Sequence, residues 1–363
     1  MRPLQLSQAE IERNVRTRDE TRSRRACLLV LASGVALGVV LPAHPVLAAL
    51  GDRRACSASA AAQFQACGLQ AGTDFFIAKA KCANAAKSEV DECLNEAETA
   101  RREARQLCSE QRAARRELCD ALGEARYHPS FDPADFDTDF TKLKNAYFPL
   151  VIGYRWEYAG GGESNTIEAV DETKLIEGVT CIVLRDRRYQ GGELVEFTDD
   201  WYGQRKDGTV DFCGEMVLNY ETFHGDDPVR PEVLDTHGQW KTGRDRDPSG
   251  YYMLGSPTVG AIHRQEYSPE NAEDVVKYLS LSYRYGDDPA LDQYVPRALV
   301  DLFCAAGDCL VTEETTPIEP ATLHHKFYAP GVGWILEVSP ATGEVLQLVS
   351  CNFDPRCATL SSP

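Results

Sequence analysis

The stretch CSASAAAQFQACGLQAGTDFFIAKAKCANAAKSEVDEC (residues 56–93) decides how this chain folds. With Cys108 and Cys119 it forms a ladder of cysteines separated by 11, 15, 11, 15 and 11 residues. Eleven residues of α-helix turn only about 20° beyond three full turns, so cysteines 11 apart share one face of a helix. They also lie about 16 Å apart along the axis, which is too far for a disulfide within one helix. Each cysteine therefore needs a partner on another helix.

The pairing depends on where the chain turns back. Two glycines and two N-cap candidates lie in GLQAGTD (residues 68–74), which predicts a turn there. Folding the chain at that point brings Cys67 opposite Cys82 and Cys56 opposite Cys93. The sequence therefore predicts an antiparallel helical hairpin held by two disulfides.

Cys108 and Cys119 have no partner in this hairpin. Residues 75–126 contain no proline and no glycine before Gly123, which predicts one long helix; a third helix, turned near residues 98–101, is the alternative. Two long helices side by side in a homodimer would pair Cys108 of one chain with Cys119 of the other. Metal binding by the cysteines is the other alternative, but the closely spaced pairs typical of zinc sites are missing.

Residues 1–49 are expected to be an export signal. They are basic up to Arg25, continue as an apolar run over residues 26–41, and end in small residues suited to cleavage. SRRACL (residues 23–28) resembles a twin-arginine signal. An uncleaved membrane anchor is the alternative, which the prolines after the apolar run disfavour.

Charge and cysteine content narrow the location and the partners. The formal net charge of −18 at pH 7 argues against a nucleic-acid partner. Cleavage of the signal would remove Cys27 from the 13 cysteines and leave an even number, which fits a disulfide framework in the periplasm or outside the cell. The candidate disulfide cysteines are Cys56, Cys67, Cys82, Cys93, Cys108, Cys119, Cys181, Cys213, Cys304, Cys309, Cys351 and Cys357.

After the helical part, apolar residues alternate with polar ones between turns. Glycine-containing turns at residues 191–192 and 206–208 predict two β-hairpins, while residues 270–279 are expected to form a helix. A Cys-led strand followed by an aromatic strand and a glycine turn occurs at Cys181 and again at Cys309, which suggests a duplicated unit in one curved sheet. The predicted fold class is α+β, with a disulfide-stapled helical hairpin and then an antiparallel, half-barrel or sandwich-like sheet. The expected domains are 1–49 (signal), 50–126 (hairpin), 127–146 (acidic linker), 147–350 (β domain) and 351–363 (a tail in which Cys351 and Cys357 close a short loop).

The β domain carries a set of motifs. They are YFPL (147–150) with Gly153, Trp156 and Tyr158, EGVTC (177–181), GELVE (192–196), DWY (200–202), GQW (238–240), RQEY (264–267) with AED (272–274), and KFYAPGVG (326–333). In these motifs the domain resembles a widespread family of exported bacterial proteins without an established activity, so the resemblance implies no catalytic residues. It is more loosely similar to curved-sheet periplasmic proteins that hold lipid or apolar ligands, which implies such a ligand on the sheet.

Aromatic residues are the best candidates for a ligand site. Side chains in a strand alternate between its faces, so several of these residues share a face. Burial in the core is their simplest interpretation, but on an open concave face they would line an apolar binding site. The candidates are Tyr154, Trp156, Tyr158, Trp201, Tyr202 and Tyr328.

The sequence carries little catalytic chemistry. It has no H-E-x-x-H, G-x-S-x-G, P-loop or C-x-x-C motif. His324 and His325 are neighbours on a predicted strand and point to opposite faces, so they cannot chelate one ion together; one is expected to be buried and the other exposed. The acidic candidates for calcium binding or for a carboxylate pair are Asp135, Asp137 and Asp139, the loops at 226–227, 245–247 and 287–288, and the residues Glu215, Glu266 and Glu273.

These observations favour an exported cell-envelope module for binding or structure. Its sheet would hold an apolar ligand or an envelope protein, its long helix would form a homodimer, and no cofactor is expected. The alternative is a hydrolase that uses calcium or zinc bound by the acidic loops, and a purely structural coat protein would bind neither ligand nor metal.

Overall fold

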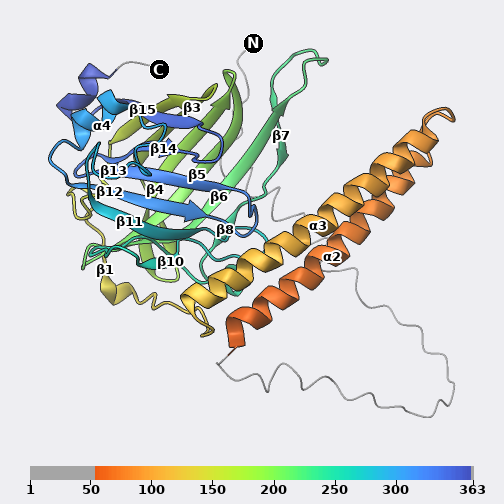
Figure 1. Ribbon diagram of the computed structural model, residues 1–363, viewed down its shortest axis with the longest axis horizontal. Coiled ribbons are helices and arrows are strands. Elements are labelled where there is room, and N and C mark those ends of the chain that lie inside the picture. Colours follow the sequence, from red (N-terminus) through yellow and green to blue (C-terminus); the bar gives the residue numbers. More distant parts are fainter. Residues whose placement is uncertain (1–53, 361–363) are drawn as a thin grey trace. The chain divides into compact units, whose positions relative to one another are not determined.

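The computed structural model describes residues 54–360, so the expected export signal lies outside the described residues. Two long helices open this part of the chain: α2 (Ala55–Cys82) and α3 (Val90–Leu122). Figure 1 shows them side by side in orange to yellow, as an antiparallel hairpin. The predicted helical hairpin is therefore confirmed.

The disulfides that hold the hairpin differ from the predicted ones. They are Cys56–Cys119, Cys67–Cys108 and Cys82–Cys93, with Cα–Cα distances of 5.6, 5.7 and 5.6 Å. The predicted pairing of Cys67 with Cys82 and of Cys56 with Cys93 is wrong. The pairing of Cys108 with Cys119 across a dimer is wrong as well, because both residues pair within the chain.

The error lies in the position of the turn. Helix α2 continues through GLQAGTD, where a Cβ on Gly68 or Gly72 would meet nothing within 4 Å. Two glycines on an open helix surface cost about 1 kcal/mol each relative to alanine, which a long helix tolerates. The chain turns instead at residues 83–89, which breaks the single helix predicted from residue 75.

The strands form one antiparallel sheet, in the order β10-β11-β12-β13-β14-β15-β2-β3-β4-β5-β6-β7. In addition, β1 pairs with β5, and both β8 and β9 pair with β6. The path ends at β10 and β7, so the sheet is not closed into a barrel. The predicted α+β class, with a disulfide-stapled helical hairpin followed by an antiparallel sheet, is confirmed. The strands are β1 (Phe136–Asp137), β2 (Arg155–Gly160), β3 (Glu163–Ile176), β4 (Val179–Gln190), β5 (Glu193–Arg205), β6 (Val210–Thr222), β7 (Pro231–Asp235), β8 (Trp240–Lys241), β9 (Gly250–Met253), β10 (Ile262–Arg264), β11 (Val275–Tyr283), β12 (Cys309–Thr315), β13 (Leu323–Ala329), β14 (Gly333–Val338) and β15 (Val345–Cys351), and α4 is Arg297–Phe303.

Both predicted hairpin turns are confirmed, since residues 191–192 join β4 to β5 and residues 206–209 join β5 to β6. Gly191, Gly192 and Gly208 have positive φ values of 58°, 89° and 90°, which glycine adopts at little cost. The helix predicted over 270–279 is wrong: β11 begins at Val275. The β-branched pair at 275–276 is buried against the sheet, and this tertiary packing outweighs the local helix signal.

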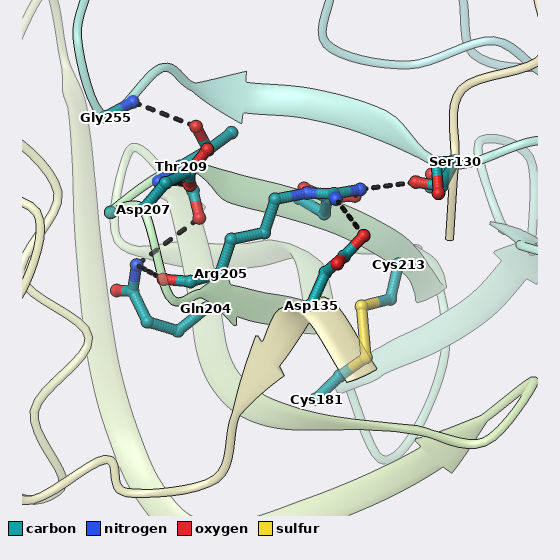
Figure 2. Close-up of polar contacts among 12 residues, drawn as sticks. Ser130, Asp135, Cys181, Gln204, Arg205, Asp207, Thr209, Cys213 and Gly255 are labelled. Atoms are coloured by element: carbon teal, nitrogen blue, oxygen red, sulfur yellow. Dashed lines mark hydrogen bonds and ion pairs between the residues drawn. A yellow bond between two sulfur atoms is a disulfide. The ribbon is translucent and has the colours of Figure 1, made fainter. Parts of the chain in front are cut away.

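Residues 127–146, predicted as an acidic linker, contact strand β5 through β1. Phe136 in β1 packs against Gly203, where a Cβ would lie 2.8 Å from the ring. Arg205 holds the stretch in place, because its guanidinium contacts Asp135 at 3.4 Å and donates to the Ser130 carbonyl (Figure 2). Figure 2 also shows the neighbouring disulfide Cys181–Cys213, and the remaining two disulfides are Cys304–Cys309 and the predicted Cys351–Cys357.

Candidate ligand-binding cavity

A cavity of about 300 Å³ lies on one face of the sheet, which we call the inner face. Strands β13 and β5 are far apart in the strand order, yet side chains from both line this cavity, so the sheet curves around it. Its volume is at the lower end of the range typical of small-molecule sites. The lining residues are Phe148, Pro149, Trp156, Tyr158, Glu163, Asn165, Ile167, Leu184, Asp186, Arg188, Asp200, Tyr202, Tyr252, His324, Lys326, Gly333, Trp334, Glu337 and Leu346.

Three of the six aromatic candidates line this cavity: Trp156, Tyr158 and Tyr202. Trp156 donates from Nε1 to the Val332 carbonyl at 2.8 Å, and Tyr158 donates to the Trp334 carbonyl at 3.0 Å. The Tyr158 and Trp334 rings stack with centroids 4.1 Å apart. These bonds fix the rings within the chain, so the apolar wall is already formed without a ligand.

The other three candidates lie elsewhere. Trp201 is on the opposite face of β5 from Tyr202 and packs in a second hydrophobic cluster with the Cys181–Cys213 disulfide. Tyr154 stacks on Phe353 at 3.8 Å. Tyr328 is fully buried in the core and donates to Glu314 at 2.9 Å.

Basic side chains on the cavity wall already have acidic partners. Burial alone would lower the pKa of Lys326, but Glu314 and Glu337 raise it well above its usual value. The neighbouring carboxylates therefore keep Lys326 charged. The pairs are Lys326–Glu314 (2.7 Å), Lys326–Glu337 (3.6 Å), Arg188–Glu163 (3.3 Å), Arg188–Glu196 (3.5 Å) and His324–Glu337 (2.8 Å).

Two acidic side chains on the wall lack such a partner. Within residues 54–360, neither Asp186 nor Asp200 forms an ion pair. Burial raises the pKa of Asp186 to about 7 and raises that of Asp200 well above its usual value, with a further rise from the charge of Asp186. Asp200 also lies opposite Glu215 in the β5–β6 register and shares a hydrogen bond with it.

Some buried polar atoms on the wall have no hydrogen-bond partner in the described part of the chain. They are Oδ1 of Asn165, Oδ1 of Asp186 and Nε1 of Trp334. Asn165 is only 6% exposed, and its Nδ2 donates to Oδ2 of Asp186 at 3.2 Å, which leaves the two Oδ1 atoms free. A buried polar group without a partner is costly, so a ligand group that reaches these two acceptors and one donor gains hydrogen bonds that the described chain does not supply.

The carboxylate pair suggested by the sequence is formed in part. The pKa of Glu215 is raised well above its usual value by burial and then by the charge of Glu266, so these two groups lie close together. Glu273 is elsewhere, bonded to Arg115 of α3. The sequence analysis did not single out Asp186 or Asp200. Asp186 lies two residues after Leu184 and Asp200 two residues before Tyr202, and this spacing along a strand indicates that each shares the inner face with its apolar neighbour.

The other acidic candidates do not form a metal site within the described residues. Among the described residues, no group of three or more His, Cys, Asp or Glu side chains is arranged to hold a metal ion. Asp139 bonds within its own loop, to Thr141 and to Lys142 at 2.8 Å. His324 and His325 are both half-buried, which differs from the expected buried and exposed pair.

The fold and the site define a disulfide-rich α+β protein with a large antiparallel sheet and a cavity on its inner face. Six disulfides indicate an oxidising, extracytoplasmic location. None of the helices in the described part of the chain is both long and apolar enough to cross a membrane. No family model, curated protein or solved structure matches the chain, so the family resemblance stays a prediction.

The raised pKa of Asp186 predicts a pH-dependent stability. Because its pKa is about 7 in the folded state and about 4 unfolded, the folded state holds the proton more tightly. Its contribution is therefore fully present below about pH 4 and is lost as the pH rises through 7. From pH 5 to pH 8 we expect the free energy of unfolding to fall by about 1–2 kcal/mol more than in Asp186→Asn, after allowing for screening in the cavity.

Urea denaturation of both proteins at pH 5, 6.5 and 8 measures this difference. The comparison with the variant cancels the opposite contribution of His263, whose pKa burial lowers to about 4. Parallel pH profiles of the two proteins would show that the Asp186 carboxyl titrates as it does in the unfolded chain.

Proposed function

We propose that the protein is exported by residues 1–49 to the cell envelope and acts there as a binding module. The curved sheet holds a small, largely apolar ligand in the cavity on its inner face. The observation that carries this proposal is the preformed aromatic wall beside polar atoms that have no partner in the described part of the chain. Known small-molecule sites combine an apolar lining with a few such polar groups.

Other features support an extracellular module. Disulfides in the hairpin and in the β domain persist only where thiols are oxidised. The sequence signals for export point to the same compartment. A homodimer through α3 is part of this proposal, but it no longer requires a disulfide between the chains, since every cysteine of the hairpin pairs within it.

Filling the cavity tests the proposal. Ile167 lines the cavity on β3, so Ile167→Trp places a large ring in the empty space rather than in the packed core. Leu175, on the same strand, is 71% exposed, which makes Leu175→Trp a matched control. We expect Ile167→Trp to weaken binding of the neutral apolar probe N-phenyl-1-naphthylamine by about tenfold or more, while the control binds as the wild type does.

Probe fluorescence measures this affinity, and native mass spectrometry of the protein exported in its own host measures any ligand already bound and the number of chains. Equal probe binding by both variants would show that the cavity is not the binding site. No detectable binding by the oxidised wild-type protein would contradict the proposed function itself.

A further inference from the structure

More acidic than basic side chains line the cavity, and the acidic side chains without an ion-pair partner in residues 54–360 are Asp186 and Asp200. Four carboxyl groups line it: Glu163, Asp186, Asp200 and Glu337. The first and the last are used by the basic side chains of the wall. Asp186 and Asp200 form no ion pair within the described residues. Arg188, whose charge acts on Asp186, is already paired with Glu163 and Glu196.

We infer that the ligand carries a protonated amine at one end of its apolar body, and that Asp186 and Asn165 receive this group. The inference rests on the proposed function and specifies the chemical class of its ligand. An ammonium group has N–H donors for the Oδ1 atoms of both residues, which have no hydrogen-bond partner within residues 54–360. Its charge also offsets the carboxylate of Asp186, which forms no ion pair among the described residues.

A hydrogen bond between Asn165 and Asp186 fixes the orientation of both side chains. The hydrogen bond of 3.2 Å from Asn165 Nδ2 to Asp186 Oδ2 ties the two side chains together across the β3–β4 pair. Asn165 is more than nine-tenths buried and lines the cavity, so its orientation is fixed by the fold. The Trp334 ring stacks on Tyr158 and already has the Lys326 ammonium 5.5 Å from its centroid, so these two rings supply apolar contact for the body of the ligand.

An anionic ligand fits this wall less well. The ammonium of Lys326 is held 2.7 Å from Glu314 and 3.6 Å from Glu337, and Arg188 lies between Glu163 and Glu196. A ligand carboxylate would have to displace one of these partners and would approach Asp186 and Asp200. The same cavity therefore discriminates against negative charge.

Probes with the same apolar body separate these possibilities. They are 4-phenylbutylamine, 4-phenylbutanol and 4-phenylbutanoate, titrated calorimetrically into the oxidised protein at pH 8. We expect the amine to bind about tenfold more tightly than the alcohol, and the acid more weakly than both. In Asp186→Asn the preference for the amine over the alcohol, taken as the ratio of the two affinities, should fall to about threefold or less. Asp171→Asn, an equal charge change at an exposed position of β3, should retain the full preference.

The wild-type protein provides a second readout that needs no variant. Asp186 is faced by Arg188 on its own strand, by Tyr158 and Asn165 on β2 and β3, and by Glu196 and Asp200 on β5. Because the pKa of Asp186 is about 7, the preference for the amine should grow from pH 6 to pH 8 while alcohol binding stays constant.

The outcomes are distinct. Alcohol binding as tight as amine binding in the wild-type protein would overturn the amine inference and leave the proposed function standing. A preference that survives Asp186→Asn unchanged would overturn the assignment to this residue. Failure of all the probes and of N-phenyl-1-naphthylamine to bind would overturn both the inference and the proposed function.

Discussion

Removing the middle disulfide of the hairpin is expected to cause a large loss of stability. In the double variant Cys67→Ala/Cys108→Ala, we expect the free energy of unfolding of the hairpin to fall by about 3–4 kcal/mol. The three disulfides are nested, with sequence separations of 11, 41 and 63 residues, so the middle one closes about 30 residues beyond the innermost. Chain entropy for a loop of that length gives roughly 3.5 kcal/mol.

The hairpin has little else to hold it together. The buried residues of α2 are Ala60, Gln63, Ala71, Phe75 and Cys82, most of them small or polar. Two helices with so narrow an apolar contact bury too little surface to compensate for the ordering of their chains. The disulfides therefore supply stability that a hydrophobic core supplies in larger domains.

Far-ultraviolet circular dichroism during thermal unfolding measures the loss. Cys351→Ala/Cys357→Ala is the matched control, because its disulfide spans only 6 residues in the β domain and its removal should cost about 2 kcal/mol without loss of helix. Peptide mapping of the non-reduced wild type should recover Cys67 linked to Cys108. Retention of full helicity and melting temperature in the hairpin variant would contradict the prediction.

The cysteine ladder shows how far spacing alone can predict the fold. The regular spacing indicates a hairpin, but a ladder of this kind can be folded at more than one point. A turn at residues 68–74 pairs four cysteines, whereas a turn at residues 83–89 pairs all six within the chain. Requiring that every cysteine find an internal partner would have selected the second turn, even though it lacks glycine.

The cavity could be predicted from the sequence only in part. Alternation along β2 puts Trp156 and Tyr158 on one face, where both line the cavity, because that pattern is local. The polar wall depends on contacts between distant strands: Lys326 on β13 and Asp186 on β4 face one cavity only because the sheet curves. The repeated Cys-led strands suggest a curved sheet, but strand periodicity does not show which distant side chains the curvature brings together, since that depends on how the strands pair.

A second large effect is expected where α3 contacts the β domain. Arg115 and Glu273 are 3% and 1% exposed, and the Arg115 guanidinium donates to both carboxylate oxygens at 2.8 to 3.2 Å. Glu270 lies 3.6 Å from the same guanidinium. Arg115→Met would leave Glu273 buried without its cation, so we expect the free energy of unfolding to fall by about 3–5 kcal/mol.

The double variant Arg115→Met/Glu273→Leu separates the cost of an unpaired charge from the value of the pair. Removing both charges should recover most of the loss, because two buried charges pay a desolvation penalty that apolar side chains avoid. Arg116→Met changes the same charge at an exposed neighbouring position and should stay within about 0.5 kcal/mol of wild type. Urea denaturation of the wild type, Arg115→Met, Glu273→Leu and the double variant gives the coupling energy, with Arg116→Met measured beside them as the control. If Arg115→Met were as stable as Arg116→Met, this ion pair would not anchor the hairpin to the sheet. The contact from Gln111 to the Ile318 carbonyl, at 2.8 Å, would then be the next to test.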